Sequence, residues 1–252
     1  MTHVIAVLNQ KGGVGKTTTT INVGAYLAKA GKRVLVIDFD PQGNATSGLG
    51  LDKHKGNTIY DVLFGRCGIE DAIVDTNVDH LCVVPANANL AAAEVELVAV
   101  DGRERSLKNV LGQLAYDYVL IDCPPSLGLL TVNALTAANQ LLVPVQAEYY
   151  ALEGLGQLLE VVQRVRGGLN PGLNLLGVLV TMYDGRTSLS DQVYKELQKH
   201  FGDKLLSTII PRNVRLAEAP SYGKPICDHD RWSKGARAYK QLSKEIVKRL
   251  GN

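Results

Sequence analysis

The sequence has 252 residues, of which 46% are hydrophobic and 21% charged. This is ordinary globular composition, which excludes disordered and fibrous classes. No apolar run approaches the roughly 18 residues that span a bilayer, and the N-terminus has neither a basic region nor a small-residue cleavage site, so we expect a cytoplasmic protein. Four scattered cysteines form no C-x-x-C pair, which predicts reduced, mostly buried thiols.

The formal net charge of +2 conceals an uneven distribution. From Arg186 onward there are 14 Lys+Arg and 7 Asp+Glu, whereas the first 185 residues hold 13 and 18. A basic final quarter is typical of a surface that faces a polyanion. A solvated set of charges without a partner is the alternative.

The first elements along the chain predict a βαβ unit. Residues 3–9, HVIAVLN, form a short run rich in β-branched residues, and residues 17–31 carry apolar positions at helical spacing and end at Gly31. Residues 33–40, RVLVIDFD, indicate a second buried strand. Such a unit has parallel strands joined by a right-handed crossover.

The same alternation continues to the C-terminal part of the chain. Further strands are predicted at 81–84, 117–123, 140–145, 173–181 and 204–210. Helices are predicted at 88–99, 103–114, 127–138, 151–167 and 190–201. We therefore expect an α/β fold with a doubly wound, mostly parallel sheet of about seven or eight strands and helices on both faces, built as one domain over 1–252.

A phosphate-binding loop lies between the first strand and the first helix. The stretch NQKGGVGKTTTT (9–20) matches the end of the pattern G-x-x-x-x-G-K-[ST] at Gly15, Lys16 and Thr17. It departs from the pattern at its first position, where Gln10 replaces the glycine. Lys16 supplies a cation for the β- and γ-phosphates, and the Thr17 hydroxyl suits Mg²⁺. The glycines that let the backbone approach a phosphate are Gly12, Gly13 and Gly15.

Carboxylates follow two other predicted strands at the same edge of the sheet. Asp122 ends one strand just before two prolines, where a Mg²⁺–nucleotide site needs an acidic residue. Many ATPases with this loop have a glutamate next, but here Cys123 follows, which predicts slow hydrolysis. Asp38 and Asp40 share a face at period two, so that one can position the attacking water while the other supports the Mg²⁺ shell. A turn role for Asp40 is the alternative.

Four segments together resemble the ParA/Soj partition ATPases, which belong to the deviant Walker A class and are relatives of MinD. The resemblance covers essentially the whole chain and rests on KGGVGKTT, DFDPQGNATSGLG (38–50), DYVLIDCPPSLG (117–128) and IPRNVRLAEAPSYGKPI (210–226). It implies that Lys11 reaches the nucleotide of the partner subunit in an ATP-bound sandwich dimer, that Asp40 is needed for hydrolysis, and that Asp122 is the Walker B aspartate. The nucleotide contacts it implies are Lys11, Gly12, Gly13, Val14, Gly15, Lys16, Thr17, Thr18, Pro211 and Asn213. The catalytic residues are then Lys11, Lys16 and Asp40. The residues at the metal are Thr17, Asp38 and Asp122.

The resemblance also implies a cycle. ATP with Mg²⁺ closes a homodimer that binds double-stranded DNA without sequence preference, and a ParB-like centromere-binding partner stimulates hydrolysis, so the protein is expected at the nucleoid. The implied DNA contacts are Arg186 and Arg215, with Lys195, Lys199, Lys204 and Lys234 as further cations. Because the phosphate loop begins at residue 11, no separate N-terminal DNA-binding domain is expected.

Two other classes share the deviant loop. MinD-like membrane positioning requires an amphipathic C-terminal helix, and residues 235–252 place four apolar side chains at helical spacing, namely Tyr239, Leu242, Ile246 and Leu250. That face lacks Phe and Trp, which favours a helix docked on the core, so membrane binding is the weaker expectation. The iron protein of nitrogenase holds an iron–sulfur cluster between subunits, for which Cys82 and Cys123 are the cysteines to consider.

Overall fold

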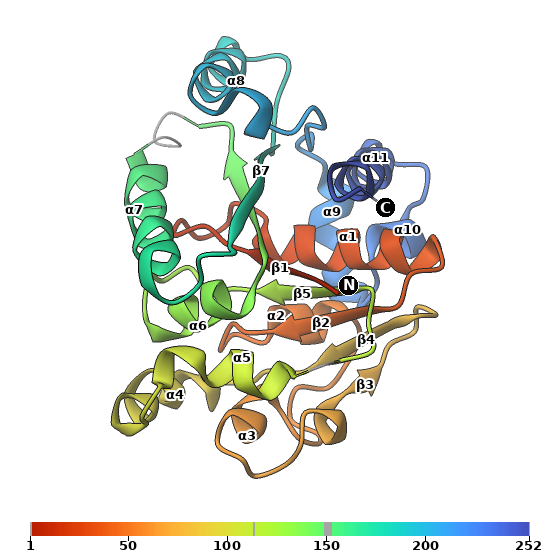
Figure 1. The fold of residues 1–252 in the computed structure, drawn as a ribbon. Helices are drawn as coiled ribbons and strands as arrows, with labels where there is room; N and C mark the ends of the chain where they lie inside the picture. The colour runs from red at the N-terminus through yellow and green to blue at the C-terminus, as the bar shows by residue number, and fades with distance from the viewer. Residues whose placement is uncertain (1, 113, 149–152, 252) are drawn as a thin grey trace.

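The computed structural model describes residues 2–112, 114–148 and 153–251. These residues form one seven-stranded sheet (Figure 1). Its strands are β1 (His3–Val7), β2 (Val34–Asp38), β3 (Val74–Asp75), β4 (Leu81–Val84), β5 (Tyr118–Asp122), β6 (Gln140–Gln146) and β7 (Asn174–Thr181). The strand order is β3-β4-β2-β5-β1-β6-β7, and every pair is parallel except β3 with β4. The predicted α/β fold with a mostly parallel sheet is confirmed.

Helices cover both faces of the sheet (Figure 1). The α-helices are α1 (Lys16–Lys29), α2 (Asn44–Gly48), α3 (Ile59–Leu63), α4 (Leu90–Glu96), α5 (Ser106–Leu111), α6 (Leu129–Ala137), α7 (Glu153–Gly168), α8 (Ser188–Phe201), α9 (Val214–Glu218), α10 (Ile226–His229) and α11 (Lys234–Arg249). Short 3-10 turns are η1 (Glu70–Ala72), η2 (Leu97–Ala99), η3 (Arg103–Arg105), η5 (Gly202–Lys204) and η6 (Ala219–Tyr222). The predicted positions 113, 151 and 152 lie outside the described residues.

The central strands contribute to two cores, one on each face. Along β1, Ile5 and Val7 pack with α1 and α11, while Ala6 packs on the opposite face with residues of α4, α5 and α6. Successive side chains of a strand point to opposite faces. Because both faces are covered, these strands read as continuous apolar runs, which is what made them recognisable in the sequence.

The prediction of a strand over 204–210 is wrong. This segment makes only isolated bridges, from Leu205 to Val178 and from Pro211 to Tyr183. Between them the Glu245 carboxylate on α11 accepts the backbone N–H groups of Ser207 and Thr208, at 2.8 and 2.9 Å. Those groups are therefore not available to extend the sheet along β7. The antiparallel edge strand β3 was not anticipated.

The C-terminal helix α11 is docked on the body of the protein. Tyr239, Leu242 and Ile246 are at most 1% exposed and belong to the same core as α1. The hydroxyl groups of Tyr239 and Thr19 on α1 lie 3.1 Å apart. The apolar face of this helix is thus occupied by intramolecular packing. In the described part of the chain, no helix has the length and apolar character needed to cross a membrane.

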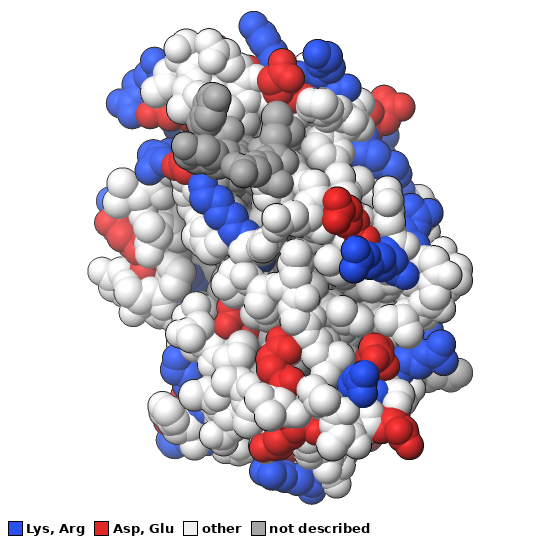
Figure 2. Space-filling model, turned by 90° about the vertical axis from the view of Figure 1, so that its left-hand side faces the viewer, with Lys and Arg blue, Asp and Glu red and all other residues white. Residues whose placement is uncertain are grey.

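The carboxyl ends of the central strands lie side by side at one edge of the sheet. Strand register aligns Asp122 with both Val7 and Asp38. Figure 2 shows this side of the molecule, where charged side chains of both signs are scattered among uncharged ones. Ligands of open α/β sheets bind at this edge.

Candidate nucleotide site

The loop between β1 and α1 has the backbone geometry of a phosphate cradle. Gly13 and Gly15 have φ of 74° and 88°, a left-handed conformation that glycine adopts without strain. Lys16 is 7% exposed, and its Nζ donates to the Lys11 carbonyl at 3.2 Å. Burial lowers the pKa of Lys16, although neighbouring carboxylates oppose the shift. The loop lines a hollow of about 290 Å³.

Asp122 lies directly beneath this loop. It is fully buried; its Oδ2 accepts from the Thr17 hydroxyl at 2.7 Å and its Oδ1 from the Thr20 hydroxyl at 3.1 Å. Burial raises the pKa of Asp122, and the like charge of Asp38 raises it further, whereas the threonine hydroxyl groups lower it. A cation placed here would restore the ionised carboxylate.

The structure separates the two aspartates of the second strand. Asp38 is fully buried, and its Oδ2 accepts from the Thr46 backbone N–H at 2.7 Å and from the Thr46 hydroxyl at 2.6 Å. Asp40 is 7% exposed and lines the hollow under the glycine loop, where its Oδ1 accepts from the Gln42 backbone N–H at 2.9 Å. Asp40 therefore faces the hollow, while Asp38 is not among the residues that line it.

The donor set suits Mg²⁺. This cation is usually held by one or two carboxylates together with substrate phosphates and water. Thr17 and Asp122 supply a hydroxyl and a carboxylate already in contact. Among the described residues no three His, Cys, Asp or Glu side chains form a metal-binding group.

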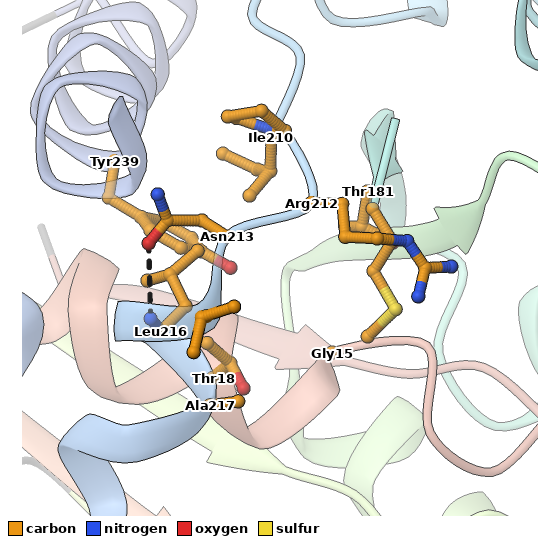
Figure 3. A pocket seen from close by; sticks show the side chains of 12 residues that line it. Gly15, Thr18, Thr181, Ile210, Arg212, Asn213, Leu216, Ala217 and Tyr239 are labelled. Carbon is orange, nitrogen blue, oxygen red and sulfur yellow. Dashed lines mark hydrogen bonds between the residues drawn. The ribbon is translucent and has the colours of Figure 1, made fainter. Parts of the chain in front are cut away.

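An apolar cavity of about 350 Å³ opens beside the loop (Figure 3). Pro211 and Asn213, two of the nucleotide contacts that the family resemblance implies, lie on its wall, and Tyr239 reaches it from α11. The Asn213 side chain caps α9 by accepting from the Leu216 N–H at 3.3 Å. This hydrogen bond fixes the turn that shapes the wall.

The hollow and the cavity adjoin each other. Gly15, Thr18 and Met182 line both. Met182 has φ of 50°, which is unusual for a side chain other than glycine and marks a strained backbone at the junction. A polar phosphate end next to an apolar base end is the shape of a nucleotide site.

Lys11 begins the loop and projects away from it. Its Nζ lies 2.9 Å from Glu148 Oε2, and the two side chains are 41% and 44% exposed. The Lys11 backbone N–H donates to Asn9, whose amide in turn donates to the Pro144 carbonyl. The loop start is thereby tied to the end of β6, while the ammonium group stays near the surface.

The two arginines predicted to contact DNA are both held by carboxylates. Asp184 accepts from Arg186 Nε at 2.9 Å and from its Nη2 at 2.7 Å. Arg215 donates to Glu218 at 2.8 Å and lies 3.6 Å from Asp230. The structure therefore partly neutralises each arginine.

Several residues of the site escaped the sequence analysis. Gln42, Asn44, Pro125 and Met182 line the phosphate hollow, and Thr20 and Thr46 hold the buried carboxylates. The role of Thr20 could have been predicted from the sequence, because a residue one helical turn after Lys16 lies on the same face of the helix. The two cysteines considered for an iron–sulfur cluster have different surroundings. Cys123 is buried, whereas the Cys82 thiol is partly exposed and donates to Asp75 at 3.2 Å.

Comparisons with known proteins agree with this geometry. A family model described as an AAA domain matches residues 2–175. The chromosome-partitioning ATPase Soj of Treponema pallidum is 53% identical over 253 residues, covering 100% of this chain and 99% of its own. The sporulation initiation inhibitor protein Soj of Bacillus subtilis is 55% identical over 250 residues, covering 98% and 99%.

A solved structure of similar fold was crystallised with a nucleotide and a metal ion. The cobyrinic acid a,c-diamide synthase of Mycobacterium smegmatis, crystallised with ADP and magnesium, superposes with a TM-score of 0.87 at 41% identity, over 99% of this chain and 96% of that one. The chain belongs to the Soj/ParA family of chromosome-partitioning ATPases and is an ATP-hydrolysing enzyme that binds ATP and Mg²⁺.

Proposed function

We propose that the protein is an ATP-driven partition switch. Mg²⁺–ATP closes a sandwich homodimer, the dimer binds duplex DNA without sequence preference, and a ParB-like partner stimulates slow hydrolysis to ADP and phosphate, which releases the DNA. The proposal is supported chiefly by the phosphate hollow and the apolar cavity that adjoins it, with the exposed Lys11 at the start of the same loop.

The chain's own groups suffice to orient a triphosphate. Backbone N–H groups of the glycine loop and the Lys16 ammonium group hold the phosphates. Asp40 lines the hollow, where it can orient the attacking water and accept its proton. Thr17 and Asp122 would hold Mg²⁺, with Asp38 behind them, and the cation would neutralise charge on the phosphate oxygens. The buried Cys123 contributes no carboxylate, consistent with slow hydrolysis.

Lys11 is placed to make dimerisation sensitive to ATP. An exposed ion pair such as that between Lys11 and Glu148 contributes only about 0–1 kcal/mol to stability, so Lys11 can break it at little cost in free energy. Binding the partner's triphosphate returns a stronger interaction only when the γ-phosphate is present.

The test compares molecular mass in ATP and in ADP by light scattering. We expect wild type to dimerise in ATP only, Asp40→Ala to form a lasting ATP dimer because hydrolysis stops, and Lys11→Ala to bind ATP as a monomer. Lys108→Ala, which removes an exposed lysine on α5, is the matched control and should behave as wild type. A Lys11→Ala protein that dimerises in ATP as wild type does would refute the role of Lys11.

Binding of the Asp40→Ala dimer to a nonspecific duplex is then measured. We expect binding that requires ATP and weakens as salt is raised.

MinD-like membrane association is the rival function. The apolar face of α11 is packed against α1, so we expect no sedimentation with anionic liposomes in ATP. Sedimentation with liposomes, without DNA binding, would transfer the assignment to membrane positioning.

A further inference from the structure

A second hollow lies beside the apolar cavity and shares part of its wall. It has a volume of about 560 Å³ and is lined by the loop after β7, by residues 211–214 and by Lys234 at the start of α11. Pro211, Arg212 and Val214 line both spaces. One short stretch of backbone therefore separates the base side of the nucleotide site from this hollow.

The charges around the hollow are unbalanced. Arg186, Arg212 and Lys234 line it, together with one carboxylate, Asp184. That carboxylate is already engaged by two hydrogen bonds from Arg186. In the part of the chain that the structure describes, the side chains of Arg212 and Lys234 make no hydrogen bond and no ion pair. Arg212 and Lys234 thus line the hollow without an ion pair or hydrogen bond of their own, although the charge of Arg212 helps to lower the pKa of Asp184.

The Arg212 side chain extends to one side of the apolar cavity. Its guanidinium group points away from Tyr239 and Asn213, which face the apolar cavity (Figure 3). Its backbone is fixed on the other side, because the Arg212 N–H donates to the Tyr183 carbonyl at 2.9 Å. The segment 211–214 therefore forms part of the wall of the apolar cavity and also places a cation, Arg212, on the second hollow.

We propose that this hollow binds a backbone phosphate of duplex DNA and that Arg212 and Lys234 are its phosphate contacts. The inference rests on the proposed DNA-binding function and extends it, since it moves the main contacts from Arg186 and Arg215 to two different residues. A phosphate contact requires an exposed cation and no base-reading element. Arg215 must first give up Glu218 and Asp230, whereas Arg212 and Lys234 have no ion pair to break.

A natural reporter lies two residues from Lys234. Trp232 is the one tryptophan of the 252-residue sequence, and it is 73% exposed. The Arg231 guanidinium group lies 4.5 Å from its ring centroid. Docking of a phosphate backbone next to it changes the polarity and the cation contact around the ring. We therefore expect its emission to respond to DNA without any added label.

The experiment titrates a nonspecific duplex into the protein with ATP at two salt concentrations, following Trp232 emission and, independently, duplex anisotropy. We expect Arg212→Ala and Lys234→Ala each to weaken binding about three- to tenfold and to reduce the salt slope by about 0.9. Arg105→Ala and Lys108→Ala, which remove exposed cations near and on α5, are matched controls expected to bind as wild type. ATP-dependent dimerisation of each variant is checked by light scattering.

Three outcomes would overturn the assignment. If the Arg212 and Lys234 variants dimerise and bind DNA as wild type while Arg215→Ala, which lies outside the lining of the hollow, does not bind, the hollow is not the phosphate site. If the control variants lose as much affinity as the two test variants, the effect is general charge and not the hollow. If the two side chains are needed for binding anionic vesicles and not DNA, the occupant is a lipid headgroup. Failure of the wild type itself to bind DNA in ATP would instead contradict the proposed function.

Discussion

The two charged regions of this protein are built in opposite ways. At the carboxyl edge of the sheet, Asp38 and Asp122 are fully buried and are held by hydroxyl and N–H groups. On the basic C-terminal surface, Arg186 and Arg215 are exposed and are held by carboxylates two or three positions away in the sequence.

The difference determines what each charge can do. A buried carboxylate loses hydration, so its protonation and the stability of the fold depend on a few fixed partners. An exposed arginine is screened and can exchange one anion for another at little cost. Substitutions at the sheet edge should therefore act strongly and depend on pH, and substitutions on the surface should act weakly and depend on salt.

The largest effect is expected at the sheet edge. Asp122→Asn keeps the shape of the side chain but removes the carboxylate that Thr17 contacts and that Mg²⁺ requires. We expect phosphate release at saturating Mg²⁺–ATP to fall by about 10²–10³-fold. Asp79→Asn, at an exposed position, is the matched control. A variant that hydrolyses ATP at the wild-type rate would remove Asp122 from the metal site.

The same substitution should stabilise the ligand-free protein at high pH. Burial raises the pKa of Asp122 above the unfolded value of about 3.9, so the native state binds more protons than the unfolded state between the two values. The free energy of unfolding of wild type therefore falls as pH rises from about 4 through the raised pKa. Asparagine does not titrate.

Urea unfolding between pH 4.5 and 8.5, without nucleotide or Mg²⁺, measures this effect. We expect Asp122→Asn to exceed wild type by about 1–2 kcal/mol at pH 8, with the difference shrinking toward pH 4.5. Added Mg²⁺–ATP should stabilise wild type more than the variant. Parallel stability curves for the two proteins would show that the ionised carboxylate is not costly in the empty site.

A partner of the second buried carboxylate should matter for stability. The Thr46 hydroxyl donates to Asp38 and accepts from the Ala86 N–H at 3.1 Å. Thr46→Val keeps the volume but removes both hydrogen bonds, and we expect the free energy of unfolding at pH 8 to fall by about 2 kcal/mol. The loss should be smaller at pH 5, because burial raises the pKa of Asp38 and the protonated acid needs the donor less. Thr46→Ser, which retains the hydroxyl, should restore most of the stability; an equal loss would point to packing instead.

The same contrast explains what the sequence could predict. The central strands are buried on both faces, so β1, β2 and β5 read as apolar runs, and the motif that follows β1 locates the phosphate loop without any tertiary information. Asp122 was predictable because the carboxyl ends of neighbouring parallel strands share one edge. Local pattern and position in the sheet were sufficient for these features.

What the sequence could not predict depends on residues distant along the chain. The segment 204–210 has the composition of a strand, but Glu245 on a later helix takes two of its N–H groups. The pairing of Lys11 with Glu148 joins positions 137 residues apart. Which surface cations are neutralised depends on which carboxylates pack beside them, so Arg212 could not be distinguished from Arg215 by sequence alone.

The smallest effect is expected on the surface, where the ion pair of Arg215 can be loosened without removing the arginine. Glu218 accepts from Arg215, which lowers the pKa of that carboxyl, and it also lies 3.7 Å from His229. Glu218→Gln removes the competing anion, so the guanidinium group becomes more available to a phosphate. We expect ATP-dependent affinity for nonspecific duplex DNA to rise about two- to threefold at low salt and the gain to vanish as salt is raised.

Anisotropy titrations at two salt concentrations measure the change, with Glu104→Gln as the matched control, since that carboxylate pairs with Arg103 on the far η3 turn. A gain that persists at high salt would mean that Glu218 acts through the shape of α9 and not through charge. A loss of affinity would mean that the ion pair holds Arg215 in its binding position. In either case the surface would then be organised like the sheet edge, by fixed partners, and the contrast between the two regions would fail.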